Sequence, residues 1–305
     1  MNRFLQAVAP GERERIFALT ALVTEDLTAW AKPHGVLAPL RFPAIAISMA
    51  AAAPWLAPAQ LAAMARIPAW IYAIDDAFDR GVFPPEERAW RVRRYAALAH
   101  GAALGAEAVA PADPYRAPLA DVTATLRACP LWPRLGAVWG EACRRMLHGM
   151  AFECDTAGSL RAGAPPPALH TYLRHGRHSI GVPLFLAGAW LLEGDARCAD
   201  RLPALQALAV AAGEAVRLAN DLRTHDKERD EGNLNALMLL AQRGPEPAAA
   251  VRSLLRRTLL HLERRAAPLG GLPAVQLITR VTAFAVDLYA DHDYHTIPHA
   301  AILRP

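Results

Sequence analysis

The stretch Ala73-Ile74-Asp75-Asp76-Ala77-Phe78-Asp79-Arg80 places three carboxylates within five residues at the end of an apolar run. On a helix, positions i and i+4 share a face, so Asp75 and Asp79 point the same way with Asp76 beside them. Three anions destabilise a helix C-terminus, where the macrodipole is already negative, unless a cation binds there. Carboxylate oxygens are ligands that suit Mg²⁺. The stretch therefore predicts a metal site formed by Asp75, Asp76 and Asp79; the alternative is a solvated acidic helix end.

A second oxygen-rich stretch follows the alanine-rich run 202–219 and reads Asn220-Asp221-Leu222-Arg223-Thr224-His225-Asp226-Lys227-Glu228. Asn220, Thr224 and Glu228 recur every four residues, which places an amide oxygen, a hydroxyl and a carboxylate on one helix face. A polar surface stripe would show the same spacing. Two oxygen-rich faces that each end an apolar helix can, however, converge at the mouth of one cavity.

Together the two stretches resemble the class I terpene synthase family, whose members carry DDxxD and, over one hundred residues later, (N/D)Dxx(S/T)xxxE. The resemblance extends from about Phe42 to Tyr294. Shorter similarities are closest to bacterial diterpene synthases of the kaurene-synthase-like type, and they lie at 172–173, 179–180, 217–222 and 226–229. The family implies an all-α bundle around a central apolar cavity. We expect a single domain over residues 1–305, with 1–10 and 297–305 loose.

Composition agrees with an all-α fold and excludes several other classes of protein. The chain has 305 residues, of which 53% are hydrophobic, and much of this material is alanine and leucine, which favour helices. Its 33 basic and 29 acidic residues are interspersed, which argues against a nucleic-acid-binding surface. The four cysteines form no CxxC pair, which fits a reducing cytoplasm. No apolar run predicts a signal peptide or a membrane span.

Proline and glycine positions divide the chain into expected helices. They cover residues 12–30, 43–53, 58–79, 84–104, a segment ending at 129, 130–154, 167–193, 199–227, 234–242, 246–265 and 275–289. Pro68 should kink the helix that carries Asp75. Pro183 should break the helix 167–193, because it lacks a backbone donor and clashes with the preceding turn.

The break at 179–182 would free carbonyl groups that, with the Ser179 hydroxyl, stabilise positive charge if they face the cavity. The family resemblance implies this role for Ser179, Ile180 and Gly181; the alternative is a kink that only improves packing. The resemblance also implies an arginine that senses the substrate diphosphate. Arg174 and Arg177 both qualify, and the sequence does not separate them.

The resemblance further implies a cluster of three Mg²⁺ ions, held by the two motifs, that binds a prenyl diphosphate. Lys227, one of two lysines in the chain, would help to neutralise the diphosphate together with Arg223 or Arg229. Many members close the site with a C-terminal Arg-Tyr pair; the matching stretch here, 291–296, has no arginine, and Tyr294 or a histidine would partly substitute. Aromatic side chains stabilise carbocations. The candidates are Tyr72, Phe78 and Phe185, and further Trp70, Phe152, Trp190, Phe284 and Tyr289.

The predicted activity is the ionisation of a C20 prenyl diphosphate, either geranylgeranyl or copalyl diphosphate, followed by cyclisation or elimination. The chain has no DxDD stretch, so a pre-cyclised substrate would come from a separate class II cyclase. A sesquiterpene cyclase acting on farnesyl diphosphate is the main alternative. A prenyl diphosphate synthase and a non-catalytic helical protein are weaker alternatives. A homodimer is left open.

Overall fold

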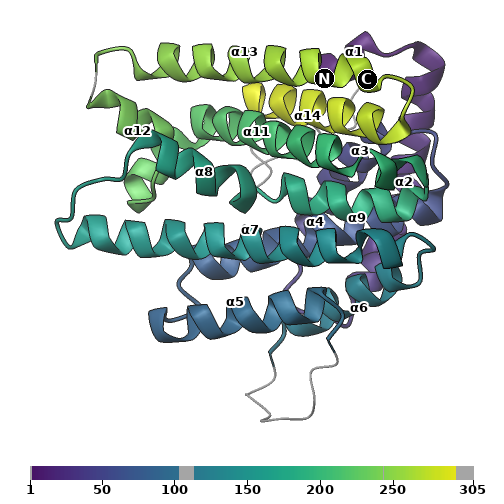
Figure 1. Cartoon of the computed structure of the whole chain (residues 1–305), viewed down its shortest axis with the longest axis horizontal. Helices are drawn as coiled ribbons and strands as arrows, with labels where there is room; N and C mark the ends of the chain where they lie inside the picture. Colours follow the sequence, from purple (N-terminus) through teal and green to yellow (C-terminus); the bar gives the residue numbers. More distant parts are fainter. Residues whose placement is uncertain (1, 103–112, 243, 293–305) are drawn as a thin grey trace.

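The computed structural model describes residues 2–102, 113–242 and 244–292, and every regular element within them is a helix (Figure 1). The helices are α1 Arg3–Ala7, α2 Pro10–Ala31, α3 Phe42–Ala52, α4 Pro58–Asp79, α5 Pro85–Ala99, α6 Arg116–Arg127, α7 Trp132–Arg161, α8 Leu169–Ser179, α9 Val182–Glu193, α10 Arg197–Asp200, α11 Leu202–Glu231, α12 Ala236–Ala241, α13 Pro247–Ala266 and α14 Pro273–Asp291; the 3-10 helices are η1 Pro39–Arg41 and η2 Ala267–Leu269. The predicted all-α fold is confirmed.

The bundle is built of antiparallel and crossing helices around a continuous apolar core. Across Figure 1, α13 packs against α11, α11 against α14 and α8, α8 against α7, and α7 against α5. Every residue of α3 is buried, and so is the segment of α9 from Pro183 to Leu191. Such helices, apolar on all sides, belong at the centre of a large helical protein.

Most helices begin with a proline in their first turn, where the missing backbone donor costs nothing. This explains why the expected bounds of α4 agree with the structure. α4 runs through Pro68 as one helix. α7 continues to Arg161, beyond the expected end near 154, because Gly158 lies within the helix and the first left-handed residue is Gly163.

The N-terminal residues differ from expectation. We expected 1–10 to be loose, but Arg3–Ala7 forms α1, which Asn2 caps by accepting a hydrogen bond from the Leu5 amide over 3.3 Å. Leu5 is buried, and the ring of Phe4 packs edge-on against Phe284 of α14. The apolar side chains anchor this turn.

Among the described residues one helix, Leu202–Glu231, is long and apolar enough to span a membrane. More than half of its apolar window is buried inside the molecule, where α11 packs against α13, α14 and α8. Its apolar residues therefore form part of the protein core.

Candidate active site

The two oxygen-rich motifs line one cavity of about 650 Å³. Asp75 and Asp79 reach it from the C-terminal end of α4, and Asn220, Thr224 and Glu228 reach it from α11. The break between α8 and α9 forms another part of its wall, and α3, α5, α7, α14 and the residues between α11 and α12 also contribute to it. The predicted convergence of the two motifs is therefore present in the structure.

The three aspartates of α4 have different surroundings. Asp75 and Asp79 make no hydrogen bond or ion pair within the described residues, whereas Asp76 is paired with Arg41 at 2.9 Å and Arg80 at 3.4 Å. Burial, with repulsion from Asp79 and Glu153, raises the pKa of Asp75. Burial and the nearby Glu153 raise the pKa of Asp79 to about 6. Asp75 and Asp79 thus present carboxylates that repel one another in the absence of a cation.

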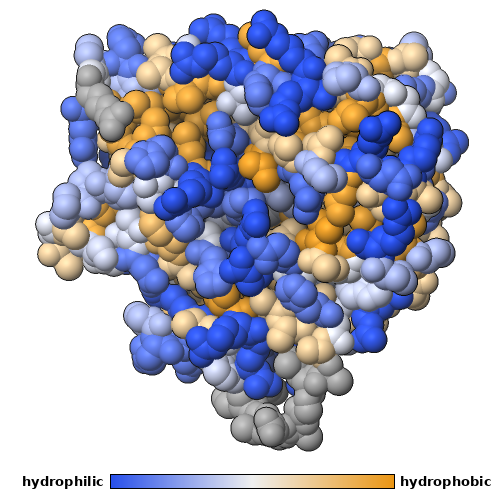
Figure 2. Space-filling model, viewed as in Figure 1, coloured by the Kyte–Doolittle hydropathy of each residue, from blue (hydrophilic) through white to orange (hydrophobic). Residues whose placement is uncertain are grey.

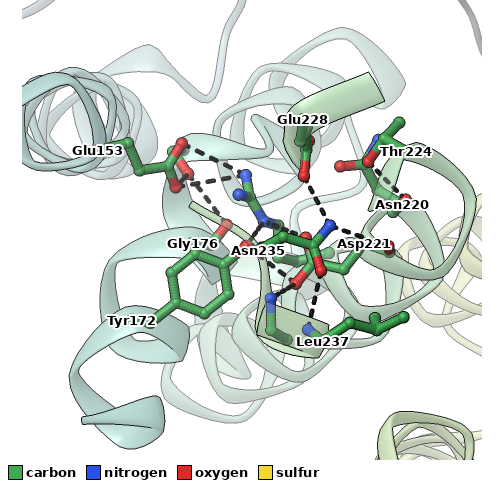
Figure 3. A network of polar contacts seen from close by, with 12 residues as sticks. Glu153, Tyr172, Gly176, Asn220, Asp221, Thr224, Glu228, Asn235 and Leu237 are labelled. Atoms are coloured by element: carbon green, nitrogen blue, oxygen red, sulfur yellow. Dashed lines mark hydrogen bonds and ion pairs between the residues drawn. The ribbon is translucent and has the colours of Figure 1, made fainter. Parts of the chain in front are cut away.

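Hydrogen bonds hold the side chains of Thr224 and Glu228 on α11 in place (Figure 3). The Thr224 hydroxyl donates to the carbonyl of Asn220 over 2.9 Å. Glu228 Oε2 accepts a hydrogen bond of 2.6 Å from Asn235 Nδ2, which also donates to the carbonyl of Asp221 over 2.9 Å. Asn235 Oδ1 in turn accepts from the Leu237 amide, which fixes the orientation of the amide group. Burial raises the pKa of Glu228 to about 7.

Asp221 forms its contacts inside the protein core. It is fully buried and accepts hydrogen bonds from the Tyr172 hydroxyl at 2.8 Å and from the Ala236 amide at 3.1 Å. Arg217 Nε lies 2.9 Å from Asp221 Oδ1 and 2.7 Å from the Tyr172 oxygen. This network ties α11 to α8 and to the start of α12 (Figure 3).

Glu153 of α7 joins the network from the other side of the cavity. It accepts a hydrogen bond of 2.6 Å from the Ser179 hydroxyl and pairs with Arg217 Nη1 at 3.3 Å. Glu153 and Arg217 both line the cavity, and the sequence analysis missed both. Helical spacing could have indicated Glu153. It lies on the same helix face as the buried residues Met146 and Met150, and a carboxylate on a buried face needs a partner.

The helix break depends on Gly181, which adopts φ +80° between α8 and α9. A Cβ atom at this position would meet Ile71 Cγ2 of α4 at 2.7 Å, so glycine also permits the close approach of the two helices. Pro183 has no amide to donate, and no backbone hydrogen bond reaches the carbonyl oxygens of Ser179 and Ile180 in the part of the chain that the structure describes. Ser179, Ile180 and Gly181 all line the cavity.

Comparison with known proteins identifies the family. Residues 66–257 match the family described as terpene synthase family 2, C-terminal metal binding. The chain belongs to this family. It is 28% identical, over 89% of its length and 90% of the relative's, to an ent-pimara-9(11),15-diene synthase of Streptomyces sp. (strain KO-3988).

Solved structures of bacterial terpene synthases share the fold. The 2-methylisoborneol synthase of Streptomyces coelicolor A3(2), in complex with Mg²⁺ and geranyl-S-thiolodiphosphate, superposes with a TM-score of 0.74 at 19% identity, over 90% of each chain. The linalool/nerolidol synthase of Streptomyces clavuligerus, in complex with 2-fluorogeranyl diphosphate, gives 0.68 at 21% identity, over 89% of this chain and 93% of that one. This protein is therefore a class I terpene synthase with a metal-binding domain.

The donor set of this terpene synthase fits Mg²⁺. Within the described residues, no three histidine, cysteine, aspartate or glutamate side chains lie close enough to hold a metal by themselves. Mg²⁺ usually keeps several waters and takes one or two carboxylates together with substrate phosphates. Two carboxylates on α4 and three oxygen donors on α11, facing one cavity, match that requirement when a diphosphate bridges them.

Only some of the other predicted site residues line the cavity of this terpene synthase. Those that line the cavity are Tyr72, Phe78, Phe185, Lys227 and Tyr289. Arg161 also lines it, and neither Arg161 nor Lys227 forms an ion pair or hydrogen bond within the described residues. The sequence analysis missed Arg161 because α7 extends further than expected. Tyr294 lies outside the described residues.

Several predicted residues lie away from the cavity in this structure. Arg174 and Arg223 are exposed, Arg229 pairs with Asp226 at 3.0 Å, and Arg177 lines a different cavity, 3.9 Å from Glu214. Four of the aromatic candidates pack elsewhere. Trp70 packs on Tyr95, Phe152 stacks on His175, Phe284 contacts Phe4, and Trp190 lines the same cavity as Arg177. Helical periodicity alone did not show which face each residue would present.

Proposed function

We propose that this terpene synthase is a diterpene synthase that ionises a C20 prenyl diphosphate and converts the carbocation into a hydrocarbon, with release of diphosphate. The substrate would be geranylgeranyl diphosphate or a bicyclic copalyl-type diphosphate. The observation that carries the proposal is the one cavity that the two oxygen-rich motifs share, which also has apolar side chains in its wall.

Asp75, Asp79, Asn220, Thr224 and Glu228 would hold the proposed cluster of three Mg²⁺ ions. Bound Mg²⁺ would neutralise the diphosphate and stabilise it as a leaving group. Support comes from the raised pKa values of Asp75, Asp79 and Glu228, which reflect buried carboxyl groups whose ionised forms lack sufficient positive charge.

Basic side chains of this chain would bind the same diphosphate. Lys227 and Arg161 line the cavity without an ion-pair partner among the described residues, so both can contact phosphate oxygens without breaking an existing pair. Arg174, Arg223 and Arg229 are exposed. In our proposal they contact the diphosphate only in the substrate-bound state. Arg217 acts differently: Glu153 and Asp221 already neutralise it.

The apolar wall would exclude water from the carbocation. Ile71, Val216, Val281 and Ala285 contribute aliphatic surface, and the aromatic rings are those of Tyr72, Phe78, Phe185 and Tyr289. Aromatic faces attract cations, and a dry cavity prevents quenching by water. The carbonyl groups of Ser179 and Ile180, which accept no backbone hydrogen bond in the described chain, are available to stabilise positive charge.

The size of the substrate is the finer part of the proposal. The C20 assignment is supported by the relative named as an ent-pimara-9(11),15-diene synthase, with which the alignment covers most of both chains. The alternative is a C15 substrate, and the similar fold of the linalool/nerolidol synthase is consistent with that alternative. A copalyl-type substrate would have to be supplied by a separate class II cyclase.

The test is incubation of the purified protein with Mg²⁺ and, separately, geranyl, farnesyl, geranylgeranyl and copalyl diphosphates, followed by mass spectrometry of the extracted hydrocarbons. A cyclic C20 product from either of the last two substrates supports the proposal. A C15 product from farnesyl diphosphate alone would replace the C20 assignment and keep the reaction class. Consumption of isopentenyl diphosphate in a parallel assay would indicate chain elongation instead.

A further inference from the structure

A second cavity, of about 620 Å³, lies between α7, α8, α9, α11 and α13. It shares no lining residue with the first cavity. Its volume lies within the range of about 300–1,000 Å³ that is usual for small-molecule sites. The family motifs do not reach it, because the residues of α11 that line it precede Asn220. The reaction proposed above therefore leaves it without a role.

The charged side chains around the second cavity are mostly basic. Four arginines line it, namely Arg145, Arg177, Arg257 and Arg265, against two glutamates. Glu141 is already neutralised, because it pairs with Arg144 and Arg145 at 2.7 Å, and these contacts lower its pKa to about 2.

Glu214 lies 3.9 Å from Arg177 and accepts a hydrogen bond from Thr258. Arg257 and Arg265 of α13 are exposed and form no ion pair or hydrogen bond within the described residues. The cavity therefore has an unbalanced positive charge on its α13 side.

Helices α7, α9 and α11 also contribute apolar side chains to the lining, namely Val138, Pro183, Trp190 and Val210. The face drawn in Figure 2, on which α7, α8, α11 and α13 lie in Figure 1, shows hydrophobic residues between hydrophilic ones. Arg177 Nε and Trp190 Nε1 are buried donors for which the described chain provides no acceptor. A cavity with an apolar wall, a basic side and unpaired donors is complementary to a ligand with an apolar chain and an anionic head.

We propose that the second cavity binds an amphiphilic phosphate of the prenyl diphosphate class, and that it does so without a metal ion. The first cavity presents ionisable carboxyl groups that repel a diphosphate unless Mg²⁺ is present. The second cavity presents guanidinium groups, which bind phosphate oxygens directly. Independence from metal thus separates the two sites. The prenyl chain in this assignment rests on the proposed function, whereas the anion site does not.

The test is isothermal titration calorimetry of the full-length protein with a farnesyl thiolodiphosphate analogue in buffer that contains EDTA. We expect one saturable site. The variant Arg257→Ala/Arg265→Ala should bind at least about tenfold more weakly, because two charge-assisted contacts are lost. The matched control is Arg252→Ala/Arg256→Ala, two exposed arginines of the same helix that do not line the cavity, and it should bind as the wild type does. Asp75→Asn should also retain this binding.

Three results would overturn the proposal: no binding in EDTA, equal loss in the two double variants, or loss in Asp75→Asn. Inorganic diphosphate serves as the second probe and should bind at least about tenfold more weakly than the analogue, because it lacks the apolar chain. Equal affinity would overturn the assignment to an amphiphile. Failure of the proposed function would appear separately, as absence of Mg²⁺-dependent product, and would leave this measurement interpretable.

Discussion

The hydroxyl of Ser179, the last residue of α8, donates a hydrogen bond to Glu153 Oε1 of α7 over 2.6 Å. Because Glu153 also pairs with Arg217 of α11, one carboxylate connects three helices at the point where α8 ends and the cavity begins. The side chain of Arg217 is 9% exposed and that of Glu153 is 21% exposed, so the pair is largely removed from water. Glu153 therefore positions the helix break relative to α11.

Replacement Glu153→Ala should lower the free energy of unfolding by about 2–3 kcal/mol, because it removes one partner of a largely buried ion pair. The control is Asp200→Ala, whose ion pair with Arg134 is exposed, and its effect should stay within about 0.5 kcal/mol. Urea unfolding monitored by circular dichroism measures both. Equal effects of the two substitutions would show that Glu153 has no special structural role.

Replacement Gly181→Ala should destabilise the protein by about 2–4 kcal/mol. Part of this cost comes from the left-handed backbone and part from a clash of the new Cβ atom with Ile71. Gly194→Ala is the matched control, since Gly194 has φ +79° and nothing lies within 4 Å of the point that a Cβ atom would occupy there. It should cost about 1 kcal/mol from the backbone alone. Adding Ile71→Ala should recover part of the loss for Gly181→Ala and none for Gly194→Ala. Recovery in neither background would contradict the clash.

Replacement Asn235→Ala should weaken the response to Mg²⁺, because Glu228 loses the donor that orients it. Loss of an outer hydrogen-bond partner of a metal ligand typically costs about 10–100-fold in metal affinity or activity. The measurement is the Mg²⁺ concentration that gives half-maximal diphosphate release, which should rise. A lower maximal rate with unchanged Mg²⁺ dependence would contradict a role in orienting Glu228.

Replacement Glu193→Gln should stabilise the protein at pH 8 and have little effect at pH 4. Glu193 is partly buried at the end of α9, and burial raises its pKa from 4.5 to about 7. The folded protein thus binds this proton more tightly than the unfolded chain. The stability that the acid form contributes is complete below pH 4.5 and is lost as the pH rises through about 7.

The expected gain for Glu193→Gln at pH 8 is about 1–2 kcal/mol, after allowance for solvent screening of a partly exposed group. Thermal unfolding between pH 4 and pH 8 measures it. Glu141→Gln is the opposite control: its arginine partners lower the pKa of Glu141 to about 2, so that substitution should destabilise at pH 8. A gain for Glu193→Gln that does not vary with pH would contradict titration as its cause.

The helices and the oxygen-rich faces of α4 and α11 could be predicted because local rules determine them. Proline in a first turn determined where α4 begins, and the interval of four residues put Asn220, Thr224 and Glu228 on one face. These signals depend only on neighbours in the chain.

The partners of buried charges could not be predicted in the same way. Glu153 and Arg217 are separated by 64 positions, and only the packing of α7 and α11 against α8 brings them together. Arg177 resembled a diphosphate ligand in the sequence, but the turn of α8 before Gly181 directs it to the second cavity. Which face of a buried helix meets which neighbour is a property of the whole bundle.

The most direct test of the central claim is the rate of diphosphate release from geranylgeranyl or copalyl diphosphate, measured against Mg²⁺ for the wild type, Asp75→Asn and Glu228→Gln. The wild type should release diphosphate with saturable Mg²⁺ dependence and form a C20 hydrocarbon. Each variant should be at least about 100-fold slower, because it loses charge that stabilises the leaving group through the metal. Wild-type rates in both variants, or no release by the wild type at any Mg²⁺ concentration, would contradict the account.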